Sequence, residues 1–247
     1  MRIKIINPNT SIEMSKNIDL IAKMYKRKDT EIVTVSSQIG PSSIDCYYDQ
    51  AFASIGVLKE VSKSMNEGFH GVIIACFDDP ALQASLEYCD IPVVGIGEAA
   101  MHLACLVGAK FSVLSMPKSS LNSIQEQVRR YGLEQRCASI RLVDVSVSEL
   151  ENNKQSVKKE LLKEGSKAIK EDNAEVIVLG CAGLAGMDKE FQNALHVPVI
   201  DGVVAAVKLM EGILDYGIKT SKVLTYRKPA AKPLKGFDKL MEDSASG

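Results

Sequence analysis

One pattern occurs twice in the chain, first as Gly71-Val72-Ile73-Ile74-Ala75-Cys76 and again as Glu175-Val176-Ile177-Val178-Leu179-Gly180-Cys181. In both copies an apolar run ends at a cysteine, and small or turn-forming residues follow. The two cysteines lie 105 positions apart, and two pairs of prolines repeat at offsets of 106 and 109 positions: Pro92 with Pro198, and Pro8 with Pro117. Landmarks that recur at nearly one offset predict a duplicated unit, and hence two similar lobes related by a pseudo-twofold axis.

Short runs rich in Val and Ile alternate with segments of helical spacing along the chain. The predicted strands are residues 2–6, 31–35, 71–75, 110–114, 139–143 and 175–179. Their near-continuous apolar content is typical of strands covered on both faces, as in parallel sheets flanked by helices. We therefore predict an α/β fold in which residues 1–97 and 206–247 form one lobe and residues 98–205 form the other.

Local signals predict where several helices begin and end. Thr10-Ser11-Ile12-Glu13 has the Thr-x-x-Glu form of a capping box, which predicts a helix start with exposed backbone donors. Gly132 and Gly217 are predicted helix stops. The charged run from Lys154 to Lys170 is typical of a solvated helix face, and residues 228–247 are predicted to form an irregular arm.

Composition excludes several classes of partner. The chain has 30 basic and 31 acidic residues, which gives no electrostatic footprint for nucleic acid or for an anionic membrane. Its 46% apolar content is enough for a packed core, yet no run approaches the ~20 apolar residues of a membrane span. Residues 1–6 meet Asn7-Pro8-Asn9 too soon for a secretory signal, so we predict a cytoplasmic protein that acts on small molecules.

The positions of the cysteines favour catalysis at two of them. Ligands of open parallel sheets sit beyond the carboxyl ends of strands, where Asn9, Cys76, Ser115 and Cys181 are predicted to lie. If the two lobes face each other, each delivers one thiol to a shared cleft from opposite sides, as a two-base proton transfer requires. The other four cysteines are predicted to behave as small apolar side chains: Cys46, Cys89, Cys105 and Cys137. The lack of paired local spacings among the six cysteines argues against disulfides.

A free thiol has a pKa of about 8.5, and the thiolate is the competent base. We expect helix N-termini after Cys76 and Cys181 to favour the anion through backbone N–H groups and the local dipole. Two thiolates in one small cleft repel each other, so the pair should titrate as a coupled unit with one base and one acid. Sulfurs on opposite faces of a reacting carbon would be roughly 6 to 7 Å apart.

Removal of a proton next to a carbonyl creates an enolate, which needs hydrogen-bond donors. Candidate donors are Asn9, Thr10, Ser42, Ser43, Ser115 and the amides of Ala182 and Gly183. Each also has a purely structural interpretation: Asn9 and Thr10 as helix caps, and Ser42 and Ser43 as turn residues. Asp78 and Asp79 could orient Cys76 or the ligand, although capping of the following helix is the simpler interpretation.

Signals for cofactors are weak. Gly95-Ile96-Gly97 lacks the third glycine of a dinucleotide-binding fingerprint, and no Walker-type phosphate loop occurs. His70, His102 and His196 share no helical i, i+4 spacing, which argues against a metal site.

Five motifs in order resemble the hydantoin and allantoin racemases of the aspartate/glutamate racemase superfamily, over residues 2 to about 240. They are Asn7-Pro8-Asn9-Thr10-Ser11, Gly40-Pro41-Ser42-Ser43-Ile44-Asp45, Ala75-Cys76-Phe77-Asp78-Asp79-Pro80-Ala81-Leu82, Gly180-Cys181-Ala182-Gly183 and Pro198-Val199-Ile200-Asp201-Gly202. The resemblance implies a homo-oligomeric enzyme without metal or organic cofactor, in which Cys76 and Cys181 are the acid/base pair. The candidate substrate-binding residues are Asn9, Thr10, Ser42, Ser43, Ile44, Phe77, Asp78, Ser115, Ala182 and Gly183.

The chain departs from the family pattern at two places. Family members commonly have glycine where Ala81 stands and Thr-Thr-Leu where this chain has Leu114-Ser115-Met116. In the glutamate and aspartate racemases a threonine soon follows the catalytic cysteine. Neither Cys76 nor Cys181 is followed by such a threonine, which argues against recognition of a free amino-acid carboxylate. The predicted reaction is therefore racemisation of a 5-substituted hydantoin or allantoin at C5. The alternatives are a maleate isomerase-like or arylmalonate decarboxylase-like enzyme of the same superfamily, or a cleft-binding protein without turnover.

Overall fold

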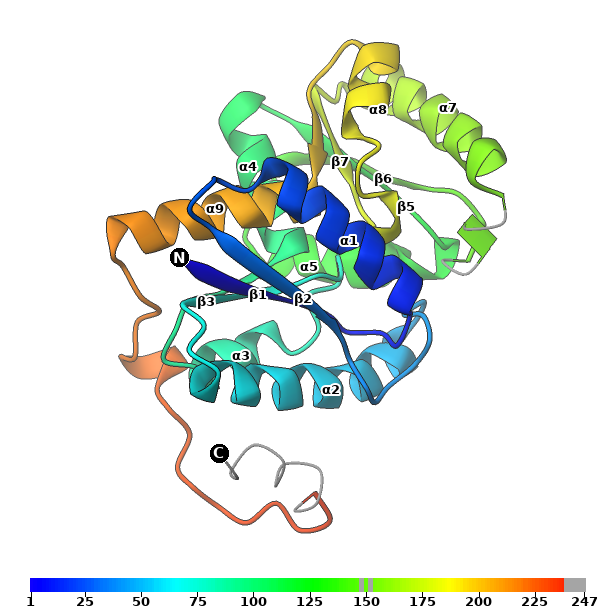
Figure 1. The fold of residues 1–247 in the computed structure, drawn as a ribbon. Helices are drawn as coiled ribbons and strands as arrows, with labels where there is room; N and C mark the ends of the chain where they lie inside the picture. The colour runs from blue at the N-terminus through cyan, green and yellow to red at the C-terminus, as the bar shows by residue number, and fades with distance from the viewer. Residues whose placement is uncertain (147–148, 151–152, 238–247) are drawn as a thin grey trace.

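The computed structural model describes residues 1–146, 149–150 and 153–237, and in it two parallel four-stranded sheets carry the fold (Figure 1). Sheet A has the order β2-β1-β3-β4, with β1 (Arg2–Asn7), β2 (Glu31–Ser36), β3 (Gly71–Ile74) and β4 (Val93–Gly95). Sheet B has the order β6-β5-β7-β8, with β5 (Phe111–Ser115), β6 (Cys137–Leu142), β7 (Val176–Leu179) and β8 (Val199–Asp201). The same order in both sheets confirms the predicted α/β fold of two similar lobes.

Helices surround both sheets. Those that follow strands of sheet A are α1 (Ile12–Tyr25), α2 (Tyr47–Asn66), α3 (Leu82–Tyr88) and α4 (Ile96–Val107). Those that follow strands of sheet B are α5 (Leu121–Arg130), α7 (Lys154–Asp172), α8 (Asp188–Leu195) and α9 (Gly202–Tyr216). Short 3-10 turns are η1 (Lys118–Ser120), η2 (Ala182–Leu184) and η3 (Leu224–Tyr226).

The apolar residues of each strand alternate between two cores, because successive side chains point to opposite faces. In β1 and β3, Ile3, Ile5 and Ile73 face a central core, whereas Ile6 and Ile74 face α2 and α3. In sheet B, Val113, Val176 and Val178 face that same central core, and Leu114 and Leu179 face α7 and α8. The helices α1, α4, α5 and α9 fill the centre, so the layers run α2/α3, sheet A, α1/α4/α5/α9, sheet B, α7/α8 (Figure 1).

Most predicted element positions are confirmed within a residue or two. The strands β4 and β8 lie outside the six predicted ones, because three residues are too few to show a period. The predicted cap of α1 is wrong by one position: Ser11, not Thr10, is the N-cap, and its hydroxyl accepts a hydrogen bond from the Met14 amide at 3.1 Å. Gly217 ends α9 with a φ of +74°, as predicted.

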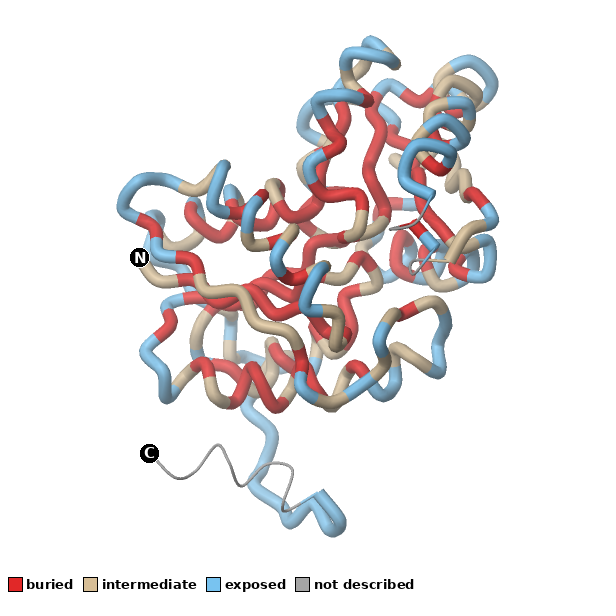
Figure 2. Tube along the Cα trace, turned by 45° about the vertical axis from the view of Figure 1, so that its right-hand side comes forward, coloured by how far each residue is buried: buried red, intermediate tan, exposed pale blue. Residues whose placement is uncertain are grey.

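The C-terminal segment leaves α9 and runs as exposed, largely irregular chain past α3 (Figures 1 and 2). Lys222 Nζ donates to the Leu86 carbonyl at 2.6 Å, which ties this segment to the end of α3. The predicted lobe boundaries stay a prediction, and residues 238–247 of the first lobe lie outside the described residues. No helix in the described part of the chain is long and apolar enough to cross a membrane.

Candidate active site

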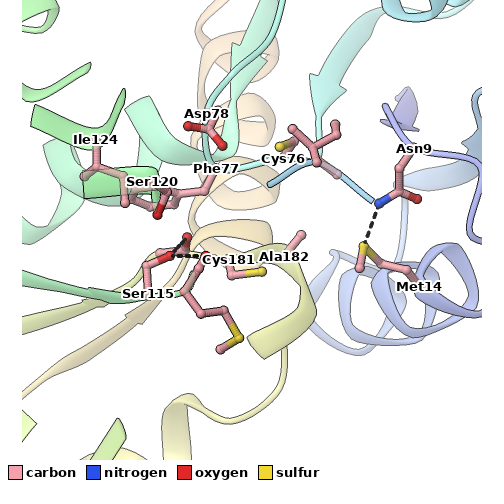
Figure 3. Close-up of a pocket in the computed structure, with 14 residues that line it drawn as sticks. Asn9, Met14, Cys76, Phe77, Asp78, Ser115, Ser120, Ile124, Cys181 and Ala182 are labelled. Atoms are coloured by element: carbon pink, nitrogen blue, oxygen red, sulfur yellow. Dashed lines mark hydrogen bonds between the residues drawn. The ribbon is translucent and has the colours of Figure 1, made fainter. Parts of the chain in front are cut away.

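A cavity of about 30 Å³ lies where the carboxyl ends of β1, β3, β5 and β7 converge (Figure 3). Eight of the twelve residues predicted for the site line it: Asn9, Ile44, Cys76, Phe77, Asp78, Ser115, Cys181 and Ala182. The sequence did not predict six further lining residues: Met14, Ala75, Met116, Ser120, Ile124 and Gly180. Met14 and Ile124 come from the helices α1 and α5, and only the packing of these helices brings them to the cavity.

Four predicted residues lie outside the cavity lining: Thr10, Ser42, Ser43 and Gly183. The Thr10 amide donates to the Pro41 carbonyl at 3.0 Å, and the Ser43 hydroxyl donates to the Asp45 carboxylate at 2.6 Å. The Gly183 amide donates to the Cys181 sulfur at 3.3 Å. Gly183 therefore acts on a site thiol without lining the cavity, and a role of these four in substrate binding stays a prediction.

Both candidate catalytic cysteines stand at equivalent places in the two sheets. The Ala75 amide donates to the Ile6 carbonyl at 2.8 Å, and the Gly180 amide donates to the Leu114 carbonyl at 2.7 Å, so each strand pairing continues to the residue before the cysteine. The Ser115 hydroxyl also donates to the Gly180 carbonyl at 2.5 Å. Cys76 and Cys181 then turn into the one cavity from sheet A and sheet B (Figure 3).

Their surroundings favour the neutral thiols, contrary to the expectation from sequence. Burial and the nearby Asp78 carboxylate raise the pKa of Cys76 well above its usual value. Burial raises the pKa of Cys181 to about 11, and the Gly183 amide acts in the opposite direction. The expected helix N-termini are missing at both thiols: α3 begins six residues after Cys76, and only the 3-10 turn η2 follows Cys181. The amides of Gly183 and Leu184 at Cys181, and of Asp78 at Cys76, lower these pKa values but do not offset desolvation of the anions.

The charge of Cys181 is one of the causes that raise the pKa of Cys76. The two thiols thus oppose each other's ionisation, as expected for a coupled pair. One thiolate and one thiol is the state in which the pair can act as base and acid.

Asp78 and Asp79 lie two and three residues after Cys76 and have different surroundings. Burial raises the pKa of Asp78, which lines the cavity and accepts a hydrogen bond from Ser123 Oγ at 2.9 Å. Asp79 is 1% exposed, and burial raises its pKa to about 7. Neither caps α3, because the N-cap of that helix is Ala81 and no side chain bonds to it. The simpler interpretation of these two aspartates from sequence is therefore wrong.

Asn9 has its side-chain oxygen committed to the protein, since it accepts from Asn7 Nδ2 at 2.8 Å and from the Ser11 amide at 2.9 Å. Its Nδ2 lies 3.2 Å from the Met14 sulfur, a weak acceptor, and lines the cavity wall (Figure 3). This amide therefore retains donor capacity that no strong acceptor takes up. In the described part of the chain, no three His, Cys, Asp or Glu side chains are grouped to hold a metal ion.

Comparisons with known proteins by sequence and by structure both find racemases. The model of the family described as Asp/Glu/Hydantoin racemase matches residues 3–210. A hydantoin racemase of Pseudomonas sp. (strain NS671) is 44% identical over 96% of this chain and 95% of its own, and one of Rhizobium meliloti is 39% identical over 96% and 98%. The solved structure of allantoin racemase from Klebsiella pneumoniae is 37% identical, covers 98% of both chains and superposes with a TM-score of 0.94.

The cysteines at matched strand ends, the two sheets of equal order and these relatives agree with the resemblance seen in the sequence motifs. The chain belongs to the Asp/Glu/Hydantoin racemase family.

Proposed function

We propose that the protein racemises 5-substituted hydantoins or allantoin at C5, with Cys76 and Cys181 as the two acid/base groups. The observation that carries the proposal is that two thiols from equivalent strand ends of different sheets open onto one cavity. The hydantoin and allantoin racemases among the relatives support this substrate class over the maleate isomerase-like and arylmalonate decarboxylase-like alternatives.

The reaction needs only a proton transfer at each face of the ring. One thiolate takes the proton from C5, and the electron pair of the C–H bond passes to the adjacent carbonyl as an enolate. The opposite thiol gives its proton to C5 from the other face, so the thiolate has moved from one cysteine to the other. Metal, flavin and pyridoxal have no step in this proposal, because the two thiols supply both proton transfers. The Asn9 amide is the proposed donor to a ring oxygen.

Substrate entry requires the site to widen. A volume of about 30 Å³ has room for about one or two water molecules and not for a five-membered ring. The cavity walls come from both lobes and from the helices α1 and α5. We propose that these walls separate when substrate enters and close around it, which would exclude water from the thiolate.

The remaining expectations are also proposals. The family resemblance supports a homo-oligomer, and six free cysteines support the reducing environment of the cytoplasm. The equal strand orders of the two sheets support the lobe assignment of residues 1–97 with 206–247 and residues 98–205.

The test is to monitor racemisation by polarimetry across a panel of allantoin and alkyl, benzyl and thioether hydantoins. Maleate and arylmalonates are tested separately, by NMR, for isomerisation and decarboxylation. Cys76→Ser and Cys181→Ser should each abolish racemisation, whereas the matched control Cys105→Ser, outside the cavity lining, should not. Each single serine variant should still exchange the C5 proton of one enantiomer with solvent deuterium. Full racemase activity in both serine variants would refute the assignment of the cysteines. A ligand that binds without any deuterium wash-in would instead indicate a binding protein.

A further inference from the structure

The turns that follow the two cysteines share one backbone feature. Five residues after each cysteine the chain adopts a left-handed conformation, with a φ of +58° at Ala81 and +85° at Gly186. Each sheet then ends in a three-residue strand, β4 or β8, and a helix starts at once, α4 at Ile96 and α9 at Gly202. These two helices pack against each other in the centre of the molecule (Figure 1).

In sheet B one buried carboxylate joins the cysteine turn to the helix. Asp201 is the N-cap of α9, and its Oδ1 accepts hydrogen bonds from the amides of Val203 at 2.8 Å and Val204 at 3.3 Å. Its Oδ2 accepts from the Gly186 amide at 2.7 Å, in the turn that follows Cys181. The N-terminus of α9 and the Cys181 turn are thus held by one side chain that is 4% exposed.

In sheet A the equivalent N-cap is Gly95, which has no side chain to offer. The carboxylate comes instead from the cysteine turn itself. Asp79 Oδ1 accepts from the Gly97 amide at 3.0 Å, and Oδ2 accepts from the Glu98 amide at 2.8 Å. Gly97 and Glu98 stand 106 positions before Val203 and Val204, the same offset that separates Gly95 from Asp201. A Cβ at Gly95 would overlap the carboxyl group of Asp79, so this carboxylate fills the space that an aspartate at position 95 would need.

Asp79 also links the Cys76 turn to the other lobe through α5. Its Oδ2 accepts from Tyr131 Oη at 2.6 Å and from Gln127 Nε2 at 3.0 Å. Gln127 also donates to the Phe77 carbonyl, and Ser123 one turn earlier in α5 holds Asp78. Every residue from 77 to 79 is therefore bonded to the helix whose other end lines the cavity with Ser120 and Ile124.

We propose that Asp79 and Asp201 are a matched pair of positioning residues, each fixing one catalytic cysteine by tying its turn to the N-terminus of a central helix. The inference rests on the proposed two-base racemisation. Neither carboxylate lines the cavity, so both act through the cysteine turns. In sheet A the anchoring carboxylate belongs to the cysteine turn, whereas in sheet B it belongs to the N-cap of the helix.

The decisive measurement is deuterium wash-in at C5, made separately for each pure enantiomer. Racemisation itself has an equilibrium constant of one, so its forward and reverse kcat/KM must change together in any variant. Wash-in with retention of configuration uses one cysteine only and therefore reports on that cysteine. Asp79→Ala should slow wash-in at least about tenfold more for the enantiomer served by Cys76, and Asp201→Ala should do so for the opposite enantiomer.

A rescue variant tests the geometry directly. Gly95→Asp alone should slow the reaction, because the new side chain collides with Asp79. In the Asp79→Ala background the same Gly95→Asp change places a carboxylate where sheet B has it and should recover most of the lost wash-in. Glu211→Gln is the matched control, since Glu211 is also a buried carboxylate that caps backbone and side-chain donors, at Arg27 and Thr30, away from both turns. It should not favour either enantiomer.

Equal slowing of both enantiomers, the same enantiomer bias in both aspartate variants, or no rescue would each overturn the proposal. If Asp79→Ala does not fold, Tyr131→Phe removes one donor to Asp79 and should give the same bias at a smaller size. Alkylation by iodoacetamide, mapped by mass spectrometry, separates this inference from the proposed function. Asp79→Ala should change the alkylation rate of Cys76 several-fold and leave that of Cys181 unchanged, even if the wild-type protein racemises none of the panel.

Discussion

At the scale of single residues, the raised pKa values make both site thiols weaker acids than free cysteine and make their thiolates stronger bases. The Asp78 carboxylate is among the causes that raise the pKa of both Cys76 and Cys181. A thiolate formed in this site is scarce at neutral pH but reactive, because basicity rises with the pKa of the conjugate acid. The site thus favours strength of the base over its abundance.

This balance predicts an alkaline pH profile. Because the base must be deprotonated and the pKa of Cys181 is about 11, kcat/KM for racemisation should still rise at about pH 10. Asp78→Asn removes a charge that opposes both thiolates and should move the rising limb to lower pH. Asp90→Asn, an exposed carboxylate paired with Lys228, is the control and should leave the limb in place. A wild-type plateau below about pH 8 would contradict the pKa directions.

At the scale of elements, both cysteine turns depend on a left-handed position five residues after the cysteine. The family resemblance noted glycine as common at the position of Ala81, and a φ of +58° gives the physical reason. An alanine there has its Cβ close to the following carbonyl, which costs about 1 to 2 kcal/mol. Gly186 meets the same need in the second turn without that cost.

Substitutions at these two positions should have opposite signs. Ala81→Gly should raise the free energy of unfolding by about 0.5 to 1 kcal/mol, since relief of the left-handed strain exceeds the added chain entropy of glycine. Gly186→Ala should lower it by more than about 1 kcal/mol, because its Cβ would also press on the Ile21 side chain. Urea unfolding of both variants beside wild type is the measurement. Destabilisation by Ala81→Gly would show that the turn needs the alanine side chain.

At the scale of the whole molecule, buried carboxylates act on stability in two directions. Burial raises the pKa of Asp79, Asp201 and Asp78, so their contribution to stability is full below an unfolded pKa of 3.8 and is lost as pH rises. For Asp79 the loss runs up to about pH 7. Hydrogen bonds from lysines lower the pKa of Glu60 and Glu164, whose contribution is present above 4.5 and is lost as pH falls.

Together these groups predict a stability maximum at mildly acidic pH. The melting temperature at about pH 5.5 should exceed that at about pH 7.5, with Asp79 alone contributing on the order of 2 kcal/mol. Differential scanning calorimetry at the two pH values measures the difference. It should shrink in Asp79→Ala, which lacks this group, and a melting temperature that rises from pH 5.5 to 7.5 would contradict the raised pKa values.

The sequence alone determined the class of fold, most of its strands, the family and the position of two cysteines at equivalent strand ends, because these depend on local apolar periodicity and on a repeat that is visible along the chain. It did not determine the state of the thiols: local turn chemistry suggested helix dipoles that favour the anion, whereas burial between two sheets disfavours it. Only the tertiary structure decided which groups surround each cysteine. Asp79 meets Gly97, Gln127 and Tyr131 at separations of 18 to 52 residues, and such contacts arise from the packing of helices between the sheets.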